Sequence, residues 1–284
     1  MRIKKRYRVL LAVLAACVLL AAAGVVFYHG EWWFPALYTM RRTTAPDLTP
    51  TELADMRLWT LDELIEQDHV TLSACMMLVN SEHPLPEGYL PELTEYNGAR
   101  MHPLMLAHYI ALRDDVQSKT GTRIYVASDY RTAEEQAAIM ASSDAGIAAA
   151  IGCSEHEAGL ALDVYAPYFG GINFLRSRAG REVNRTCSEY GFVLRYPYGK
   201  EAITGIAYEP WHLRYVGQPH ARIMTESGLT LEEYVALLTP GVWYASGEYY
   251  IARLSPDDLR LPANFSYCDI SPDNTGYYIV TVRK

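Results

Sequence analysis

Residues 154–163 read Ser-Glu-His-Glu-Ala-Gly-Leu-Ala-Leu-Asp, and this stretch decides how the rest of the chain is interpreted. His156 and Asp163 are seven residues apart, too far to be neighbours on one helical face. Gly159 interrupts the stretch, and the residues after it predict a strand on which Ala161 and Asp163 share a face. We therefore expect a loop that carries His156, turns at Gly159 and enters a strand that delivers Asp163.

A second stretch, residues 209–212 (Glu-Pro-Trp-His), ends 49 residues after Asp163 and adds an imidazole and a carboxylate. The proline after Glu209 biases that residue toward extended backbone, which is typical of a turn or a strand entry. A catalytic zinc takes three protein ligands and keeps a fourth position for water, and a nearby carboxylate can accept the proton of that water. We interpret His156, Asp163 and His212 as the ligands of one zinc ion, and Glu209 as the general base.

Each of these residues, taken singly, has a more ordinary explanation. A histidine before a glycine is more often a packed or surface side chain than a ligand. An aspartate at the end of a strand is usually a turn former. Only the two stretches together favour a metal site.

The pattern Ser154-x-His156-x-x-Gly159-x-Ala161-x-Asp163, followed by Glu209-x-x-His212, resembles the VanY-type zinc D-alanyl-D-alanine carboxypeptidases. That group also holds VanX-type dipeptidases and L,D-carboxypeptidases. The resemblance covers about residues 74–220 and includes residues 78–80, 84–86, 130–131 and 191–197 in the same order. It implies an α+β fold in which a small antiparallel sheet with flanking helices carries a single zinc site.

The resemblance also implies which side chains bind substrate. Arg131 matches the arginine that binds substrate and supports the oxyanion, a task that suits a permanently charged, fork-shaped guanidinium. Family members often have Ser-Gly-Tyr-Arg where residues 128–131 read Ser-Asp-Tyr-Arg, a difference that leaves the local backbone and charge open, although Asp tolerates the left-handed conformation better than most residues. The further substrate contacts that we expect are Gln136, Ser154, Tyr130 and Trp211. Trp211, beside His212, has core packing as an equal alternative.

The N-terminus has the pattern of a membrane segment. Five basic residues lie within residues 1–8, and residues 9–28 carry no charge. At about 1.5 Å per residue these 20 residues span roughly 30 Å, the thickness of the hydrocarbon core of a bilayer. The basic flank predicts a cytoplasmic tail and an extracytoplasmic catalytic domain. We favour an uncleaved single-pass anchor, and a cleaved signal peptide is the alternative.

We divide the chain into five segments. They are a basic tail (1–8), a transmembrane anchor (9–28), a stalk with one helix over Thr51–Asp68 (29–73), the zinc peptidase domain (74–240) and a β-rich C-terminal appendage (241–284). The alternative for residues 29–73 is that they form the first layer of the peptidase domain. Hydrophobic periodicity and capping patterns predict helices over 103–118, 178–190 and 229–238, and a further helix after Thr132. Short strands are expected over 123–128, 160–164, 192–196 and 212–216, and within 242–254 and 276–282.

The net charge limits the classes of partner that the protein can bind, and the cysteine content bears on disulfide formation. The formal net charge is −8, and removing the five basic residues of the tail leaves −13 for the remainder. Such an acidic ectodomain argues against binding nucleic acid through bulk charge. Four cysteines lie outside the anchor, and their spacing does not decide whether they form disulfides or stay as free thiols.

We therefore predict a membrane-anchored zinc carboxypeptidase that removes the terminal D-Ala from peptidoglycan stem peptides. L,D-carboxypeptidase or D-Ala-D-Ala dipeptidase activity remains open, as does a role in vancomycin resistance. A non-catalytic wall-binding module is a further alternative, but it would be expected to lose Glu209 or a ligand. A serine D,D-peptidase is excluded because no lysine has a serine three residues before it.

Overall fold

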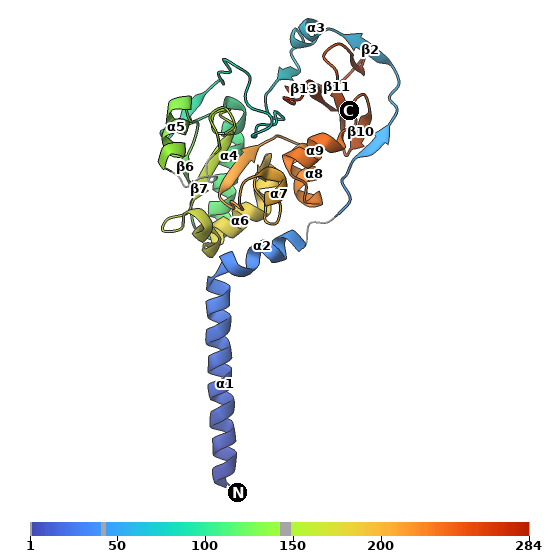
Figure 1. Cartoon of the computed structure of the whole chain (residues 1–284). Helices are drawn as coiled ribbons and strands as arrows, with labels where there is room; N and C mark the ends of the chain where they lie inside the picture. The colour runs from blue at the N-terminus through green and yellow to red at the C-terminus, as the bar shows by residue number, and fades with distance from the viewer. Residues whose placement is uncertain (1, 41–43, 143–148, 284) are drawn as a thin grey trace.

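The computed structural model describes residues 2–40, 44–142 and 149–283. Helix α1 (Arg2–Tyr28) projects away from the folded body, and α2 (Gly30–Met40) then runs along the base of that body (Figure 1). Within α1, Leu10–Tyr28 is long and apolar enough to cross a membrane, with a mean hydropathy of 2.9 and none of it buried. A signal sequence meets the same criterion. Residues 2–8 of the predicted basic tail continue α1, whereas Met1 lies outside the described residues.

A four-stranded antiparallel sheet in the order β6-β7-β9-β8 lies at the centre of the body. Its strands confirm the four predicted in this part of the chain: β6 (Tyr125–Ser128), β7 (Ala161–Tyr165), β8 (Phe192–Leu194) and β9 (His212–Tyr215). Strand β7 is flanked by β6 and β9, so it is held by backbone hydrogen bonds on both sides. A side chain on β7 therefore has a fixed position relative to both neighbours.

Helices α4 (Pro103–Thr120) and α6 (Arg178–Thr186) pack against one face of this sheet. Leu162 and Leu213 of the sheet share an apolar core with Leu112 of α4 and Val183 of α6. Helix α4 confirms the helix expected over 103–118 and ends, as predicted, at Gly121, whose φ of 74° suits glycine. The helix predicted over 178–190 is α6 continued by a 3₁₀ turn, η2 (Cys187–Tyr190).

Four C-terminal strands join β1 and β3 in a second, six-stranded sheet, in the order β1-β10-β11-β14-β13-β3. The bounds of its strands are β1 (Thr49–Thr51), β3 (Val70–Leu72), β10 (Trp243–Ser246), β11 (Tyr249–Leu254), β13 (Tyr267–Pro272) and β14 (Tyr278–Arg283). The strands expected within 242–254 and 276–282 are thus confirmed. Because β1 and β3 come from residues 29–73, this sheet joins that segment to the C-terminal one.

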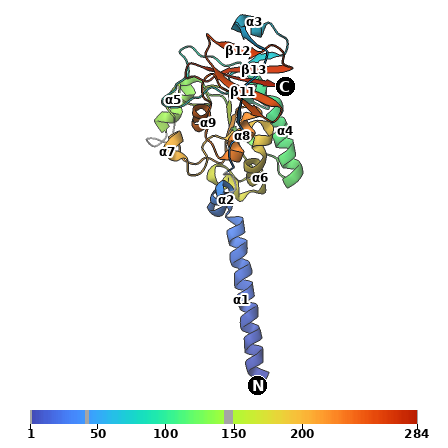
Figure 2. The same ribbon diagram turned by 90° about the vertical axis from the view of Figure 1, so that its right-hand side faces the viewer.

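Helices α8 (His220–Ser227) and α9 (Leu231–Leu237) lie beneath the six-stranded sheet, as Figure 2 shows. Ile251 and Ile279 of the sheet share a core with Tyr234 of α9 and with Val193 of β8. The helix predicted over 229–238 is confirmed as α9, with Thr230 and Glu233 forming the expected capping box. This shared core connects the second sheet to the sheet that carries the site.

The prediction of one helix over Thr51–Asp68 was wrong. Only α3 (Leu61–Ile65) is helical there, capped by Thr60, and β2 (Met56–Trp59) precedes it. Strand β2 pairs with β12 (Leu259–Pro262), about 200 residues later in the chain. Local periodicity gives no sign of that distant partner, which explains the error.

The remaining elements surround the site. They are the hairpin β4 (Thr94–Tyr96) and β5 (Ala99–Met101), the 3₁₀ helix η1 (Gly171–Arg176), and the helices α5 (Ala133–Ser142) and α7 (Glu201–Thr204). Helix α5 follows Thr132, whose hydroxyl accepts from the backbone N–H of Glu135, as predicted. No disulfide forms among the described residues.

Candidate metal centre

The turn at Gly159 orients the loop that precedes β7. Gly159 has a φ of +70°, and a Cβ there would lie 3.1 Å from the Leu93 side chain, so this position strongly favours glycine. The backbone N–H of Gly159 donates to the carbonyl of His156, and the carbonyl of Gly159 accepts from the N–H of His102. These bonds fix His156 beside the start of β7, as the sequence predicted.

Strand register then brings Asp163 next to the second stretch. Asp163 of β7 lies directly opposite His212 of β9 on one side and Ser128 of β6 on the other. His212 is the first residue of β9, and its N–H donates to the carbonyl of Glu209 across a tight turn. The N–H of Glu209 in turn donates to the carbonyl of Tyr196, which holds the base candidate over the same edge.

The three predicted ligands converge. One ligand atom from each of His156, Asp163 and His212 lies within 4.8 Å of the other two. His156 Nε2 is 3.4 Å from Asp163 Oδ2, and His212 Nδ1 is 3.1 Å from Asp163 Oδ1. The two imidazole rings are nearly perpendicular, with centroids 5.0 Å apart. Two nitrogens and a carboxylate arranged around one point are a donor set that suits a divalent transition metal.

Unpartnered buried atoms support the fit of a cation. His156 Nε2 and Asp163 Oδ1 are buried without a hydrogen-bond partner. His156 Nδ1 is 2.7 Å from the carbonyl of Asp129, to which it donates, so the lone pair of His156 lies on Nε2. A ligating histidine whose other nitrogen bonds a carbonyl is typical of metal sites. The residues present therefore fit a metal ion.

Glu209 lies beside this cluster without being part of it. Its Oε2 is 3.6 Å from His212 Nδ1, and about a fifth of its side chain is exposed. Burial raises the pKa of Glu209, and the negative charge of Asp163 adds to the rise, against the effect of His212. A carboxylate with a raised pKa, next to a candidate metal position, can accept and return a proton.

Arg131 reaches the cluster from the end of β6. Its guanidinium donates to Ser128 Oγ at 2.9 and 3.1 Å and to Gln136 Oε1 at 3.2 Å. It also lies 3.4 Å from Asp163 Oδ2. These contacts hold the arginine rigidly beside the cluster, as an anion-binding group requires.

Most of the predicted site residues line one pocket of about 170 Å³. Its lining includes Arg131, Gln136, Ser154, His156, Asp163, Glu209 and His212. Tyr130 and Trp211 are not among the lining residues. The Tyr130 ring lies under the guanidinium of Arg100, and Trp211 packs against the apolar core. Their predicted substrate contacts remain predictions.

The same pocket contains residues that sequence reasoning did not select. Tyr196 packs beside His212, with ring centroids 4.8 Å apart, and Ile139, Ala149 and Ile206 add apolar walls. The only sequence signal for Tyr196 is its position within the 191–197 motif. An isolated tyrosine before a proline does not by itself indicate a role in a pocket. Apolar wall residues carry no local signal at all.

Glu155 is the main residue that the sequence did not indicate. Its Oε1 accepts from Arg195 Nε at 2.6 Å and from Arg214 at 2.8 Å, and all three side chains are buried. Its Oε2 has no hydrogen-bond partner and lies 3.6 Å from His212 Nε2. Glu155 therefore faces the ring nitrogen of His212 that points away from the cluster. A carboxylate in that position orients a ligating histidine.

Electrostatics in the cluster favour charged carboxylates. Burial alone would raise the pKa of Asp163, but the neighbouring imidazoles of His156 and His212 outweigh this effect and hold the pKa far below its usual range. Burial likewise opposes the ionisation of Glu155, and the charges of Arg214 and Arg195 overcome it. Both carboxylates are therefore ionised at neutral pH.

Comparison with known proteins agrees with this geometry. Residues 98–218 match the family model described as VanY: D-alanyl-D-alanine carboxypeptidase. The chain is 38% identical over 162 residues to a D-alanyl-D-alanine carboxypeptidase of Enterococcus faecium, a match covering 55% of this chain and 52% of that relative. It is 36% identical over 181 residues to the bifunctional D-Ala-D-Ala dipeptidase and D-Ala-D-Ala carboxypeptidase VanXYC of Enterococcus gallinarum. That match covers 56% of this chain and 92% of the relative. The chain thus spans about half the length of the first relative and nearly all of the second.

Two solved structures are similar. The vancomycin resistance D,D-dipeptidase VanXYg, in complex with a D-Ala-D-Ala phosphinate analog, matches with a TM-score of 0.63 and 29% identity. That match covers 74% of this chain and 94% of the other. A mutant of the vancomycin resistance D,D-pentapeptidase VanY in complex with Zn(II) matches with a TM-score of 0.51 and 33% identity, covering 57% of this chain and 98% of the other.

Proposed function

Because this chain belongs to the family of VanY-type D-alanyl-D-alanine carboxypeptidases, we propose that it is a zinc carboxypeptidase that releases the terminal D-Ala from peptidoglycan stem peptides. The observation that carries the proposal is the convergence of His156, Asp163 and His212 within 4.8 Å, with Glu209 beside them. A non-catalytic wall-binding module would be expected to lack Glu209 or one of the ligands. All four residues are present here and lie close together.

We propose that zinc is held by Nε2 of His156, the carboxylate of Asp163 and Nδ1 of His212. When bound there, zinc supplies a Lewis acid that lowers the pKa of a water molecule and polarises the scissile carbonyl. The relative whose structure contains Zn(II) supports this choice of metal.

The side chains around the zinc position supply proton transfer, oxyanion stabilisation and substrate binding. Glu209 accepts the proton of the attacking water and returns it to the departing amine. Arg131, fixed by Ser128 and Gln136, donates hydrogen bonds to the oxyanion that develops on the carbonyl carbon. Gln136 and Ser154, both buried in the pocket, bind the terminal residue.

A second activity has specific support. The relative from Enterococcus gallinarum, nearly all of which this chain covers, has both dipeptidase and carboxypeptidase activity in its name. The free dipeptide D-Ala-D-Ala is therefore the second candidate substrate, and L,D-carboxypeptidase activity on a tetrapeptide is the third.

Product analysis distinguishes these activities. The protein is incubated with zinc and, separately, with a stem pentapeptide, a stem tetrapeptide or D-Ala-D-Ala, and the products are identified by mass. We expect loss of one D-Ala from the pentapeptide, and no loss with Glu209→Ala. If all three substrates stay intact with zinc-loaded protein, the proposed function is refuted.

We also propose that α1 anchors the protein in a membrane, with the peptidase body on the extracytoplasmic side where stem peptides are found. The apolar span Leu10–Tyr28 and the basic residues before it support this orientation. Protease added to intact protoplasts should digest the body while the cell contents stay protected. Release of the body into the medium without α1 would instead indicate a cleaved signal peptide.

A further inference from the structure

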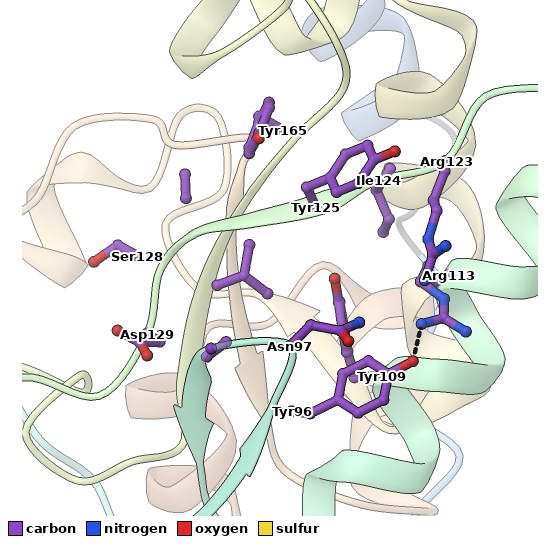
Figure 3. Close-up of a pocket in the computed structure, with 14 residues that line it drawn as sticks. Tyr96, Asn97, Tyr109, Arg113, Arg123, Ile124, Tyr125, Ser128, Asp129 and Tyr165 are labelled. Atoms are coloured by element: carbon purple, nitrogen blue, oxygen red, sulfur yellow. Dashed lines mark hydrogen bonds between the residues drawn. The ribbon is translucent and has the colours of Figure 1, made fainter.

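A hollow of about 450 Å³, which we call the β6 hollow, lies along the edge of the four-stranded sheet (Figure 3). Strand β6 ends the order β6-β7-β9-β8, so it is an edge strand. The hollow is lined by residues 123–129 of β6 and the segment before it, by residues 96–99 of the β4–β5 hairpin, and by Tyr109 and Arg113 of α4.

At one end of the hollow the hairpin is hydrogen-bonded to residues 129 and 130, which directly follow β6. The N–H of Tyr130 donates to the carbonyl of Arg100 at 3.0 Å, and the N–H of Arg100 donates to Asp129 Oδ2 at 2.5 Å. Beyond this junction, residues of the hairpin and residues of β6 line opposite parts of one open space. Edge strands with open space beside them are sites where an extended peptide can lie.

The same junction separates the hollow from the candidate metal centre by one segment of chain. Ser128 and Asp129 line the β6 hollow. Ser128 Oγ accepts from Arg131, which lines the metal pocket, and the carbonyl of Asp129 accepts from His156. The hollow and the metal pocket are therefore neighbours across residues 128–131.

Aromatic rings and guanidinium groups form the far end of the hollow. Figure 3 shows Arg113 and Arg123 at the end opposite to Ser128 and Asp129. Arg113 is already bonded to the hydroxyl of Tyr96 and to Asp114. Within the described part of the chain, Arg123 has no carboxylate within 4 Å, and its guanidinium lies 5.9 Å from the ring of Tyr125. At the end opposite to Asp129, the hollow thus presents the positive charge of Arg123 in a protein of formal net charge −8.

The spacing fits a peptide strand. Five residues separate Ser128 from Arg123, which is about 16 Å of strand at roughly 3.3 Å per residue. An extended substrate whose cleaved bond lies at the metal pocket would therefore bring residues about three to five positions upstream close to Arg123. Tyr125, which is 42% exposed, offers those residues an aromatic face on the way.

We propose that the β6 hollow binds the part of the substrate on the amino side of the cleaved bond, as an extended acidic peptide that runs beside β6 and pairs a carboxylate with Arg123. This proposal rests on the proposed peptidase function and adds its substrate class. The hollow is a subsite that favours long, anionic peptides over short or neutral ones.

The test compares three synthetic substrates that all end in D-Ala-D-Ala. One is a neutral acetylated tripeptide, one is a pentapeptide with a glutamyl carboxylate upstream, and one is the same pentapeptide with that carboxylate amidated. For the unaltered protein we expect kcat/KM to be about five-fold higher for the acidic pentapeptide than for its amide, the size of one partly exposed ion pair. The difference should appear mainly in KM and should shrink in high salt.

Arg123→Gln should abolish the preference for the acid over the amide while leaving cleavage of the tripeptide unchanged, which also shows that the variant is folded. Tyr125→Ala should lower kcat/KM for both pentapeptides and leave the tripeptide unaffected. The matched control is Arg178→Gln, an exposed arginine at the start of α6, away from the hollow, which should keep the full preference.

An unchanged acid-to-amide ratio in Arg123→Gln overturns the proposal. So does an equal kcat/KM of the unaltered protein for the acidic pentapeptide and its amide, because no carboxylate is then recognised. If the unaltered protein cleaves none of the three peptides, the proposed function itself has failed, which is a different outcome.

Discussion

Replacing Glu155 by glutamine tests whether this buried carboxylate positions a metal ligand. Glu155 is 0% exposed, binds Arg195 and Arg214 through Oε1, and faces His212 Nε2 at 3.6 Å through Oε2. Glutamine keeps the shape of the side chain but removes its charge. The substitution therefore separates the electrostatic role of Glu155 from its packing.

The structure gives the expected magnitudes. Breaking a buried ion pair costs about 3–5 kcal/mol because a charge is left uncompensated. Arg195 keeps two bonds to Glu232, and Arg214 keeps the carbonyls of Cys75 and Met77. We therefore expect the lower end, about 3 kcal/mol, for the loss in free energy of unfolding. Loss of the carboxylate that orients His212 should weaken zinc binding about 10- to 100-fold.

Two measurements and one matched control decide the matter. Urea unfolding of the zinc-free protein gives the stability, and competition with a chelator of known affinity gives the zinc dissociation constant. Glu232→Gln is the control, because Glu232 also bonds Arg195 but makes no contact with His212. Glu232→Gln should destabilise the fold but keep a zinc affinity within about two-fold of that of the unaltered protein. Equal zinc affinity in Glu155→Gln and the unaltered protein would refute the positioning role, as would an equal loss in the control.

Three further predictions concern the site and the second sheet. Glu209→Gln should retain one zinc per chain and lower kcat by about 10²–10⁴-fold, since it removes the general base; a kcat within ten-fold of the unaltered protein would reject that role. His156→Ala should lose zinc, measured by elemental analysis after dialysis, so full occupancy in this variant would reject the ligand set. Burial raises the pKa of Asp269 to about 7, against a hydrogen bond from Ser73. The folded state therefore holds this proton more tightly than the unfolded state, whose pKa is about 3.9, and stability falls as pH rises through this range. Relative to Asp269→Asn, the unaltered protein should lose about 2 kcal/mol of unfolding free energy between pH 5.5 and pH 8; parallel pH profiles from urea unfolding would contradict this.

The sequence predicted the cluster of His156, Asp163 and His212 because local signals fix its parts. Gly159 forces the turn before β7, and the alternation after it gives Asp163 its face on the strand. What the sequence alone could not supply was the register that places Asp163 opposite His212. The resemblance to a known family supplied that pairing.

Long-range features escaped prediction for a physical reason. Strand β2 forms because β12 provides its backbone partners, and nothing within residues 51–68 reveals them. The role of Glu155 left no local signal, because Arg195 and Arg214, which explain its burial, come 40 and 59 residues later. The β6 hollow likewise exists only where the hairpin, α4 and the edge strand meet.

The central claim is that one zinc ion is held by His156, Asp163 and His212 beside Glu209. Anomalous diffraction at the zinc absorption edge, from crystals of the protein grown with zinc, tests it most directly. The account predicts one peak at about 2.0–2.2 Å from Nε2 of His156, a carboxylate oxygen of Asp163 and Nδ1 of His212. A zinc peak elsewhere in the molecule, with none between these three side chains, would contradict it.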